Sequence, residues 1–424
     1  MTSQLILGNG FGVAVASDQA VTIGNRVRTY ENAKKIHPLA DPHRLAVLQS
    51  GHVGLCGMPV GVLLEDWKNS LGTQQRTVEG YRDNFLTWLQ DNLNDWTTST
   101  ERDGLAWWSL DADLEELWDD VQTEVGPGRE EKSQADLQEE VLRFVREANR
   151  KLLEYPIFEH ELEAMADEIF DRLSQEGADG RPMLSERVDY WFDDPGSDEI
   201  SQEVHRYLRL QVGRTINFPN RTSTFLAFTG YGANDLLPHW SGVYLYGAIG
   251  NHVCRNLWPM QKARRRGSSY AMVHPFGQRE MIDQVLYGWD RKFAEDAAEA
   301  TFEHIAGQER KPVDPPNPTG GDDILGEHGN AEDQDEAAST KEDWRATLME
   351  KSTDLAWKRR GEPALRTIAS LPLSSLADAA GSLVSIQNLS QNIHGELPTV
   401  GGYIDVATIT KGEGFQWVSR QNDD

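Results

Sequence analysis

Residues 2–18 read TSQLILGNGFGVAVASD, and they hold the most informative pattern in this 424-residue chain. Gln4 to Gly8 and Phe11 to Ala16 are apolar segments of strand length. They flank Asn9-Gly10, a dipeptide that favours a tight, two-residue primed hairpin turn. The pattern predicts two antiparallel strands, with Asp18 just past the end of the second.

Thr2 precedes the first of these strands and directly follows Met1. Removal of Met1, usual before a small residue, would leave Thr2 with a free α-amine beside its own hydroxyl. The hydroxyl oxygen is a nucleophile. The amine, with an ordinary pKa of about 7.7–8.0, suits the role of its base at neutral pH.

Two further strands are predicted before residue 52. A third stretch runs to Asn32-Ala33-Lys34-Lys35-Ile36, and a fourth, Arg44 to Gln49, ends in Ser50-Gly51. A threonine, an acid, a lysine pair and a glycine therefore lie at the ends of successive strands.

This arrangement resembles the amino-terminal part of proteasome β-subunits and of simpler bacterial proteasome-like peptidases, both N-terminal nucleophile (Ntn) hydrolases. Near the carboxyl end, residues 400–409 resemble the family's Gly-Gly-x-Ile-Asp-Val-Ala-x-Ile strand. The remaining matching segments are Ala16–Ala20 with Gly24-Asn25, Asn32–Ile36, Ser50-Gly51 and, in the middle of the chain, Phe228–Gly232 followed by Leu237-Pro238.

The resemblance implies an α+β fold, the four-layer α/β/β/α sandwich of Ntn hydrolases. The family has only a short connection where this chain has an acidic, helix-prone stretch, so we expect an inserted helical subdomain. The expected divisions are 2–96 (amino-terminal half of the core), 97–213 (insertion), 214–306 (central strands and helix of the core), 307–341 (loop) and 342–424 (carboxyl-terminal helices and strands of the core).

Local sequence patterns predict further helices and strands and one disordered loop. Gln308 to Lys341 is rich in Pro, Gly and acids, and low hydrophobicity with high charge predicts disorder there. The predicted helices are Pro59–Leu71, 78–93, Pro275–Ile305, Glu342–Arg360 and Leu373–Asn388, and the later strands are Ile216–Gly230, Gly242–Ile249, Tyr403–Thr410 and Phe415–Ser419.

The resemblance also assigns roles. Thr2 is the nucleophile, and a lysine ammonium lowers the pKa of its amine and hydroxyl while Asp18 fixes that lysine. The family's lysine directly precedes the apolar residue, which makes it Lys35. Because this chain has one extra residue between Asn25 and Asn32, Lys34 remains the alternative.

Three further residues complete the implied site. Gly51 would offer its backbone N–H to the developing oxyanion, where a side chain could obstruct the substrate. Active family members carry an Asp and a Ser in a pattern like Asp-x-x-Ser-Gly-Gly. Here the sequence is Gly-Glu-Leu-Pro-Thr-Val-Gly-Gly, so Glu396 and Thr399 are the candidates if the loop shifts by one residue.

The implied activity is that of a threonine endopeptidase acting on peptides or unfolded proteins. It would work inside a homo-oligomeric ring, with an unfoldase as a candidate partner and with no cofactor or metal. Two alternatives remain: a non-peptidase Ntn amidohydrolase that cleaves a small amide, and a catalytically inert assembly subunit on the same fold.

The amino-acid composition limits the kinds of partner molecule and the cellular location that we expect. The net charge of −27 argues against nucleic acid and anionic membranes. Cys56 and Cys254 are too few for a disulfide framework and are expected to be free thiols. No signal peptide or membrane-length apolar run is evident, which favours the cytoplasm.

Overall fold

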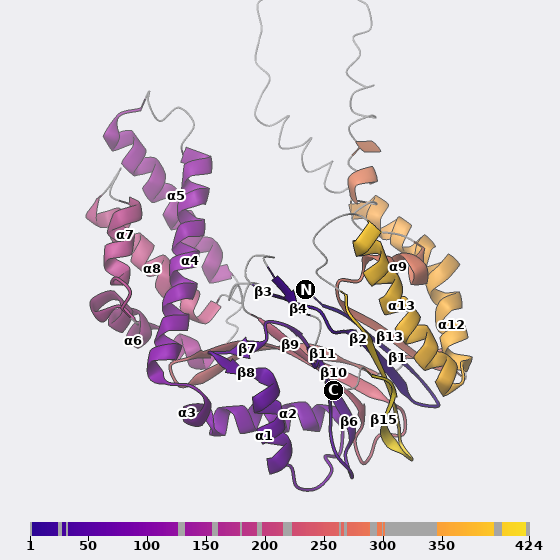
Figure 1. The fold of residues 1–424 in the computed structure, drawn as a ribbon. Coiled ribbons are helices and arrows are strands. Elements are labelled where there is room, and N and C mark those ends of the chain that lie inside the picture. The colour runs from indigo at the N-terminus through magenta and orange to yellow at the C-terminus, as the bar shows by residue number, and fades with distance from the viewer. Residues whose placement is uncertain are drawn as a thin grey trace, which may run out of the picture. The chain divides into compact units, whose positions relative to one another are not determined.

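The structure is a computed structural model, shown in Figure 1. It describes residues 2–23, 28–30, 33–125, 132–154, 160–178, 180–192, 197–214, 223–262, 264–266, 269–288, 295–298, 300–301, 346–393 and 401–420. The chain divides into two units, one comprising Met1–Ala33, Ala263–Thr408 and Trp417–Asp424, the other Lys34–Lys262 and Ile409–Gln416. The predicted loop 307–341, Glu396 and Thr399 lie outside the described residues.

The first unit is built on a six-stranded sheet with the order β12-β13-β1-β2-β14-β15. The central strand β1 pairs antiparallel with β13 on one side and with β2 on the other. The strands are β1 (Ser3–Asn9), β2 (Val13–Asp18), β12 (Arg264–Arg266), β13 (Ser269–Gly277), β14 (Ile404–Thr410) and β15 (Gly414–Ser419), and β3 (Val21–Ile23) and β4 (Arg28–Tyr30) form a separate pair.

The β1–β2 hairpin confirms both predicted strands but corrects the turn. Gly8 pairs with Val13, and the Asn9 amide donates to the Gly12 carbonyl at 2.9 Å, so the two residues between the paired positions are Gly10 and Phe11, not Asn9 and Gly10. The Asn9 side chain explains the difference. It accepts from the Phe11 amide and donates to the Ile368 and Leu371 carbonyls at 2.8 and 2.9 Å, which ties the turn to the end of a helix.

Helices cover one face of this sheet (Figure 1). Leu5, Leu7, Ala14 and Ala16 of the first two strands pack there against Leu376, Ala380 and Val384, among others. The helices of the first unit include α9 (Glu280–Tyr287), residues 346–356, the π-helical turn η2 (Trp357–Gly361), α12 (Glu362–Ser370) and α13 (Leu373–Ile393), and α12 and α13 contact the strands.

The single long helix predicted for Pro275–Ile305 is wrong. Pro275 lies in β13, where it pairs with Leu5. The helix α9 begins at Glu280, and Gly288 ends it in the left-handed conformation with φ of 74°. The predicted helix therefore included the end of a strand, β13, which is stabilised by its pairing with β1.

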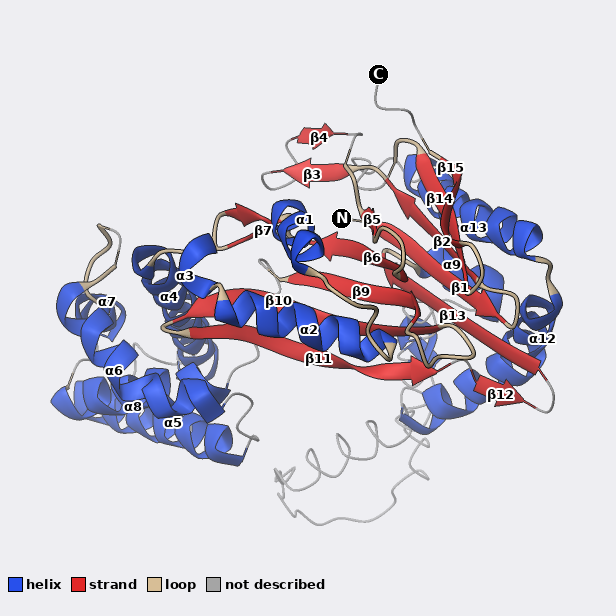
Figure 2. Ribbon diagram, turned by 90° about the horizontal axis from the view of Figure 1, so that it is seen from below, coloured by secondary structure: helices blue, strands red, loops and turns tan. Residues whose placement is uncertain are grey.

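The second unit contains a five-stranded antiparallel sheet with the order β11-β10-β9-β6-β5. Figure 2 shows α2 lying along β9, β10 and β11. The elements are β5 (Ile36–Pro38), β6 (Arg44–Gly51), β9 (Thr224–Tyr231), β10 (His239–Ile249), β11 (His252–Lys262), the short pair β7 (Gly54–Leu55) and β8 (Met58–Pro59), and the helices α1 (Val60–Ser70), α2 (Val78–Asp91) and α3 (Leu93–Trp96).

Between α3 and β9 every described secondary-structure element is helical. The helices α4 (Ser99–Val125), α5 (Gln134–Glu154), α6 (His160–Glu176), α7 (Leu184–Phe192) and α8 (Asp198–Arg214) share one apolar core. That core extends to Tyr246, Ile249 and Cys254 of the sheet. The helical segment therefore packs as a cluster and is anchored on β10 and β11.

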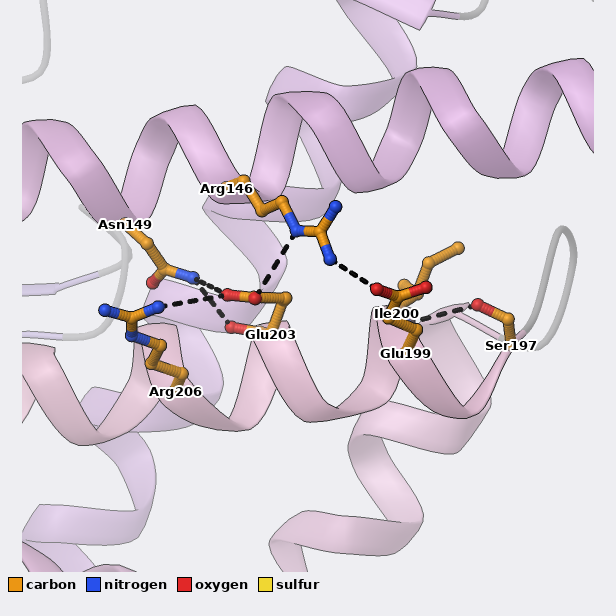
Figure 3. Close-up of polar contacts among 7 residues, drawn as sticks. All are labelled: Arg146, Asn149, Ser197, Glu199, Ile200, Glu203 and Arg206. Carbon is orange, nitrogen blue, oxygen red and sulfur yellow. Dashed lines mark hydrogen bonds and ion pairs between the residues drawn. The ribbon is translucent and has the colours of Figure 1, made fainter.

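Polar contacts join α5 to α8 (Figure 3). The buried Asn149 amide donates to the backbone carbonyl and to the carboxylate of Glu203 at 3.0 and 2.9 Å. Arg146 forms ion pairs with Glu199 and Glu203. At the start of α8 the Ser197 hydroxyl accepts from the Ile200 amide at 3.2 Å and caps the helix.

The described structure mixes helices with antiparallel sheets, which confirms the α+β class. In the part of the chain that is described, no helix combines the length and apolar character needed to cross a bilayer.

Candidate functional site

The backbone of Thr2 is held by the end of β13. Ser3 pairs with Gly277, and the Gln278 amide donates to the Thr2 carbonyl at 2.8 Å. Gly277 has φ of 69°, and a Cβ on it would lie 1.9 Å from the Thr2 carbonyl oxygen, so only glycine fits. The backbone at Thr2 is thus held in place by hydrogen bonding at the end of the sheet.

Asp18, at the end of β2, binds the backbone of the residue that follows Thr2. Its carboxylate is fully buried, and Oδ1 accepts from the Ser3 amide at 2.9 Å. Oδ2 accepts from the Gly401 amide at 3.4 Å. Through these two hydrogen bonds, Asp18 connects the residue after Thr2 to the start of the Gly-Gly segment.

Lys34 and Lys35 begin the second unit and differ sharply in exposure. Lys35 is buried, with 5% of its surface exposed, whereas Lys34 is exposed. The Lys35 carbonyl accepts from the Gln49 amide at 2.9 Å, which continues the β5–β6 ladder. The buried member of the pair is the one that the family pattern selects.

A buried histidine supports this strand pair. His37 Nε2 lies 3.2 Å from Oε1 of Gln49. Burial, together with the nearby Lys68 ammonium, lowers the pKa of His37 to about 4. His37 is therefore neutral at physiological pH and adds no positive charge near Lys35.

Gly51 ends β6 opposite Thr224, with φ of 81°. A Cβ there would lie 2.3 Å from the Ser223 carbonyl oxygen. The close approach of β9 alone therefore requires glycine at this position, independently of any role in oxyanion binding.

The structure thus brings together Thr2, Ser3 and Asp18 in the first unit, and it places Lys35 and Gly51 in the second. Glu396 and Thr399 lie outside the described residues, although Gly401 and Gly402 are within them.

Sequence reasoning gave no role to two buried side chains beside the site. Asp405, inside the quoted Gly-Gly strand motif, accepts at Oδ1 from Nε2 of Gln19 at 2.9 Å. Gln19 directly follows Asp18. Both residues stood within matched segments, but nothing in the sequence pairs an acid with an amide 386 positions away.

The described residues include both cysteines and several histidines and acids. They contain no group of three or more His, Cys, Asp or Glu side chains arranged to hold a metal ion. Cys56 and Cys254 do not form a disulfide, and Cys254 is buried. Burial raises the pKa of the Cys56 thiol, which accepts a hydrogen bond from the Ala248 amide at 3.2 Å.

A scan against known protein-family models gave no match, and a search of curated proteins found no similar sequence.

Proposed function

We propose that this chain is an N-terminal threonine hydrolase of the proteasome β-subunit type, which cleaves peptide bonds after removal of Met1. The observation that carries the proposal is the double anchoring beside Thr2: Gln278 holds its carbonyl, and Asp18 holds the next amide. A nucleophile needs a fixed position, and an ordinary amino terminus does not need a fully buried carboxylate.

In the proposed reaction, Thr2 Oγ attacks the carbonyl carbon of the substrate and its proton passes to the Thr2 α-amine. Collapse of the tetrahedral intermediate expels the substrate amine, which takes that proton, and leaves an ester on Thr2. Water then hydrolyses the ester. Lys35 supplies the positive charge that tunes the Thr2 amine, and the Gly51 amide donates to the oxyanion.

The same proposal includes the four-layer α/β/β/α sandwich that the resemblance implies, and a closed homo-oligomeric ring that encloses the site. Enclosure would restrict the substrate to peptides or unfolded chains, delivered by an unfoldase partner. The proposed cellular location is the cytoplasm.

The decisive experiment uses an electrophile specific for N-terminal threonine, such as a peptide epoxyketone or a β-lactone, with the adduct mapped by mass spectrometry. We expect one adduct on Thr2 in a chain that has lost Met1, and none in Thr2→Ala. Hydrolytic activity from a preparation that retains Met1 would contradict the mechanism.

The two lysines form a matched pair of variants for the same assay. Lys35→Ala should lower the rate by several orders of magnitude, and the exposed neighbour change Lys34→Ala should have little effect. Reversed effects would move the role to Lys34 and keep the mechanism, whereas two unaffected rates would reject it.

A further inference from the structure

Asp405 and Gln19 form a buried pair that the proposed reaction does not yet use. Both side chains are buried in the first unit, and the Gln19 amide donates to Asp405 Oδ1 at 2.9 Å. Without this acceptor, a buried amide N–H would lose its partner, which is costly. The pair therefore fixes the conformation of Gln19.

The backbone of Gln19 contacts two segments that lead to candidate residues. It follows Asp18, whose carboxylate binds the Ser3 amide. Its own carbonyl accepts from the Ala33 amide at 3.1 Å, and Ala33 is the residue before Lys34 and Lys35. The backbone of Gln19 thus links Asp18 to the segment that leads into the lysine pair, while its side chain is held by Asp405.

The far end of this connection is rigid. Asp405 lies on β14, which is next to β2 in the six-stranded sheet. Four residues earlier, the Gly401 amide donates to Asp18 Oδ2. The segment 401–405 therefore holds residues 18 and 19 at two points.

We propose that Asp405 is a positioning residue for the Thr2 reaction, acting through Gln19 on Asp18 at the end of β2 and on Ala33, which precedes the lysine pair. The inference rests on the proposed function. The proposed function gives Asp405 no role. This inference assigns a role to its hydrogen bond with Gln19, which an asparagine at position 405 could also accept.

The test compares four single variants, and the double variant of Asp405→Leu with Gln19→Leu, in the full-length protein. Asp405→Leu and Gln19→Leu remove the bond by replacing a polar side chain with an apolar one, and Asp405→Asn keeps an acceptor oxygen. Thr408→Val, a change to another buried polar residue of β14, controls for disturbance of the strand. The readout is the rate of Thr2 adduct formation with an epoxyketone, resolved into maximal rate and half-saturating concentration and divided by the folded fraction.

We expect Asp405→Leu and Gln19→Leu each to lower the maximal rate by about 10- to 100-fold, with the half-saturating concentration little changed. The double variant should fall no further, because both changes break the same contact. Asp405→Asn should recover a rate close to wild type, and Thr408→Val should leave it unaltered. An unaltered maximal rate in Asp405→Leu, additive single effects or a failed asparagine rescue would overturn the inference.

Hydrogen–deuterium exchange separates this inference from the proposed function. In Asp405→Leu the Ala33 amide should exchange faster than in wild type, whether or not Thr2 is reactive. If wild-type Thr2 forms no adduct, the proposed function fails by itself. Wild-type protection of Ala33 in Asp405→Leu would then reject the inference independently.

Discussion

Gly51 has two possible reasons to be a glycine: the proposed binding of the oxyanion and the close approach of the Ser223 carbonyl. The resemblance assigns Gly51 to the oxyanion, but β9 already excludes a side chain at this position. Loss of activity in a Gly51 variant would therefore say nothing about catalysis unless stability is measured as well.

We expect Gly51→Ala to lower the free energy of unfolding by about 2–4 kcal/mol, since alanine must adopt a left-handed φ and meet the Ser223 carbonyl. Urea unfolding followed by tryptophan fluorescence measures the change. Gly72→Ala is the control, because a Cβ at Gly72 meets no atom within 4 Å. Equal stability of the two variants would contradict the steric argument.

Asp113 is a second residue whose surroundings control its behaviour. It lies on α4 with 7% of its surface exposed, beside a small cavity whose lining includes Ser109, Gln211 and Ile249. Burial, with Glu116 nearby, raises the pKa of Asp113 to about 8. The unfolded chain ionises near its ordinary pKa of about 3.9, so the folded state holds a proton that the unfolded state releases between these values.

The folded state is therefore destabilised as pH rises between these two pKa values. The contribution of Asp113 to stability is full below about pH 4 and is lost as pH rises through about 8. Asp113→Asn should therefore be more stable than wild type at pH 8.5 by about 2–5 kcal/mol, with a much smaller difference at pH 4. Urea titrations at the two pH values measure this, with the exposed Glu115→Gln on the same helix as control. A pH-independent difference would contradict the buried-carboxyl explanation.

The candidate site shows what sequence can and cannot provide at the scale of single residues. The positions of Thr2, Asp18, Lys35 and Gly51 at strand ends followed from local patterns. The bond between Gln19 and Asp405 did not, because it joins strands that are adjacent only in the folded sheet. Burial separates Lys34 from Lys35, and it too depends on the folded chain.

At the scale of elements, local patterns were reliable where pairing or packing is local. The β1–β2 strands, α1 and the β14–β15 strands lie close to their predicted bounds. The strand β11 was not predicted at all. Its residues His252–Lys262 include exposed Leu257 and Trp258 and lack a clear alternation, and β10 supplies the pairing that makes them a strand.

The α5–α8 contact allows a prediction about two kinds of polar interaction. Asn149 is 1% exposed and bonds Glu203 twice, whereas Arg146 forms its ion pairs at the surface. Asn149→Ala should destabilise the protein by about 1–3 kcal/mol, because it removes two hydrogen bonds to partly buried acceptors of Glu203. Arg146→Ala should cost less than about 1 kcal/mol, since exposed ion pairs contribute little. Urea unfolding measures both, and a larger loss for Arg146→Ala would reverse the argument.

At the scale of the whole molecule, charge and the proposed ring act against each other. Each chain carries a net charge of −27, so neighbouring copies repel over distances up to the Debye length. That length falls from about 10 Å at 0.1 M salt to about 3 Å at 1 M salt. Contacts between copies should therefore strengthen as salt is added.

We accordingly expect the oligomeric fraction to rise between 20 mM and 500 mM sodium chloride, and Thr2 reactivity per chain toward a long unfolded substrate to follow it. Light scattering coupled to size-exclusion chromatography measures the mass at each salt concentration. Reactivity toward a small epoxyketone in the same samples is the control, since access of a small molecule depends less on enclosure. A chain that stays monomeric at both salt concentrations while fully cleaving unfolded protein would exclude the ring and favour a hydrolase that acts alone. A monomer that reacts with small amides only would instead favour the small-amide alternative, because such a substrate needs neither an enclosed chamber nor an unfoldase.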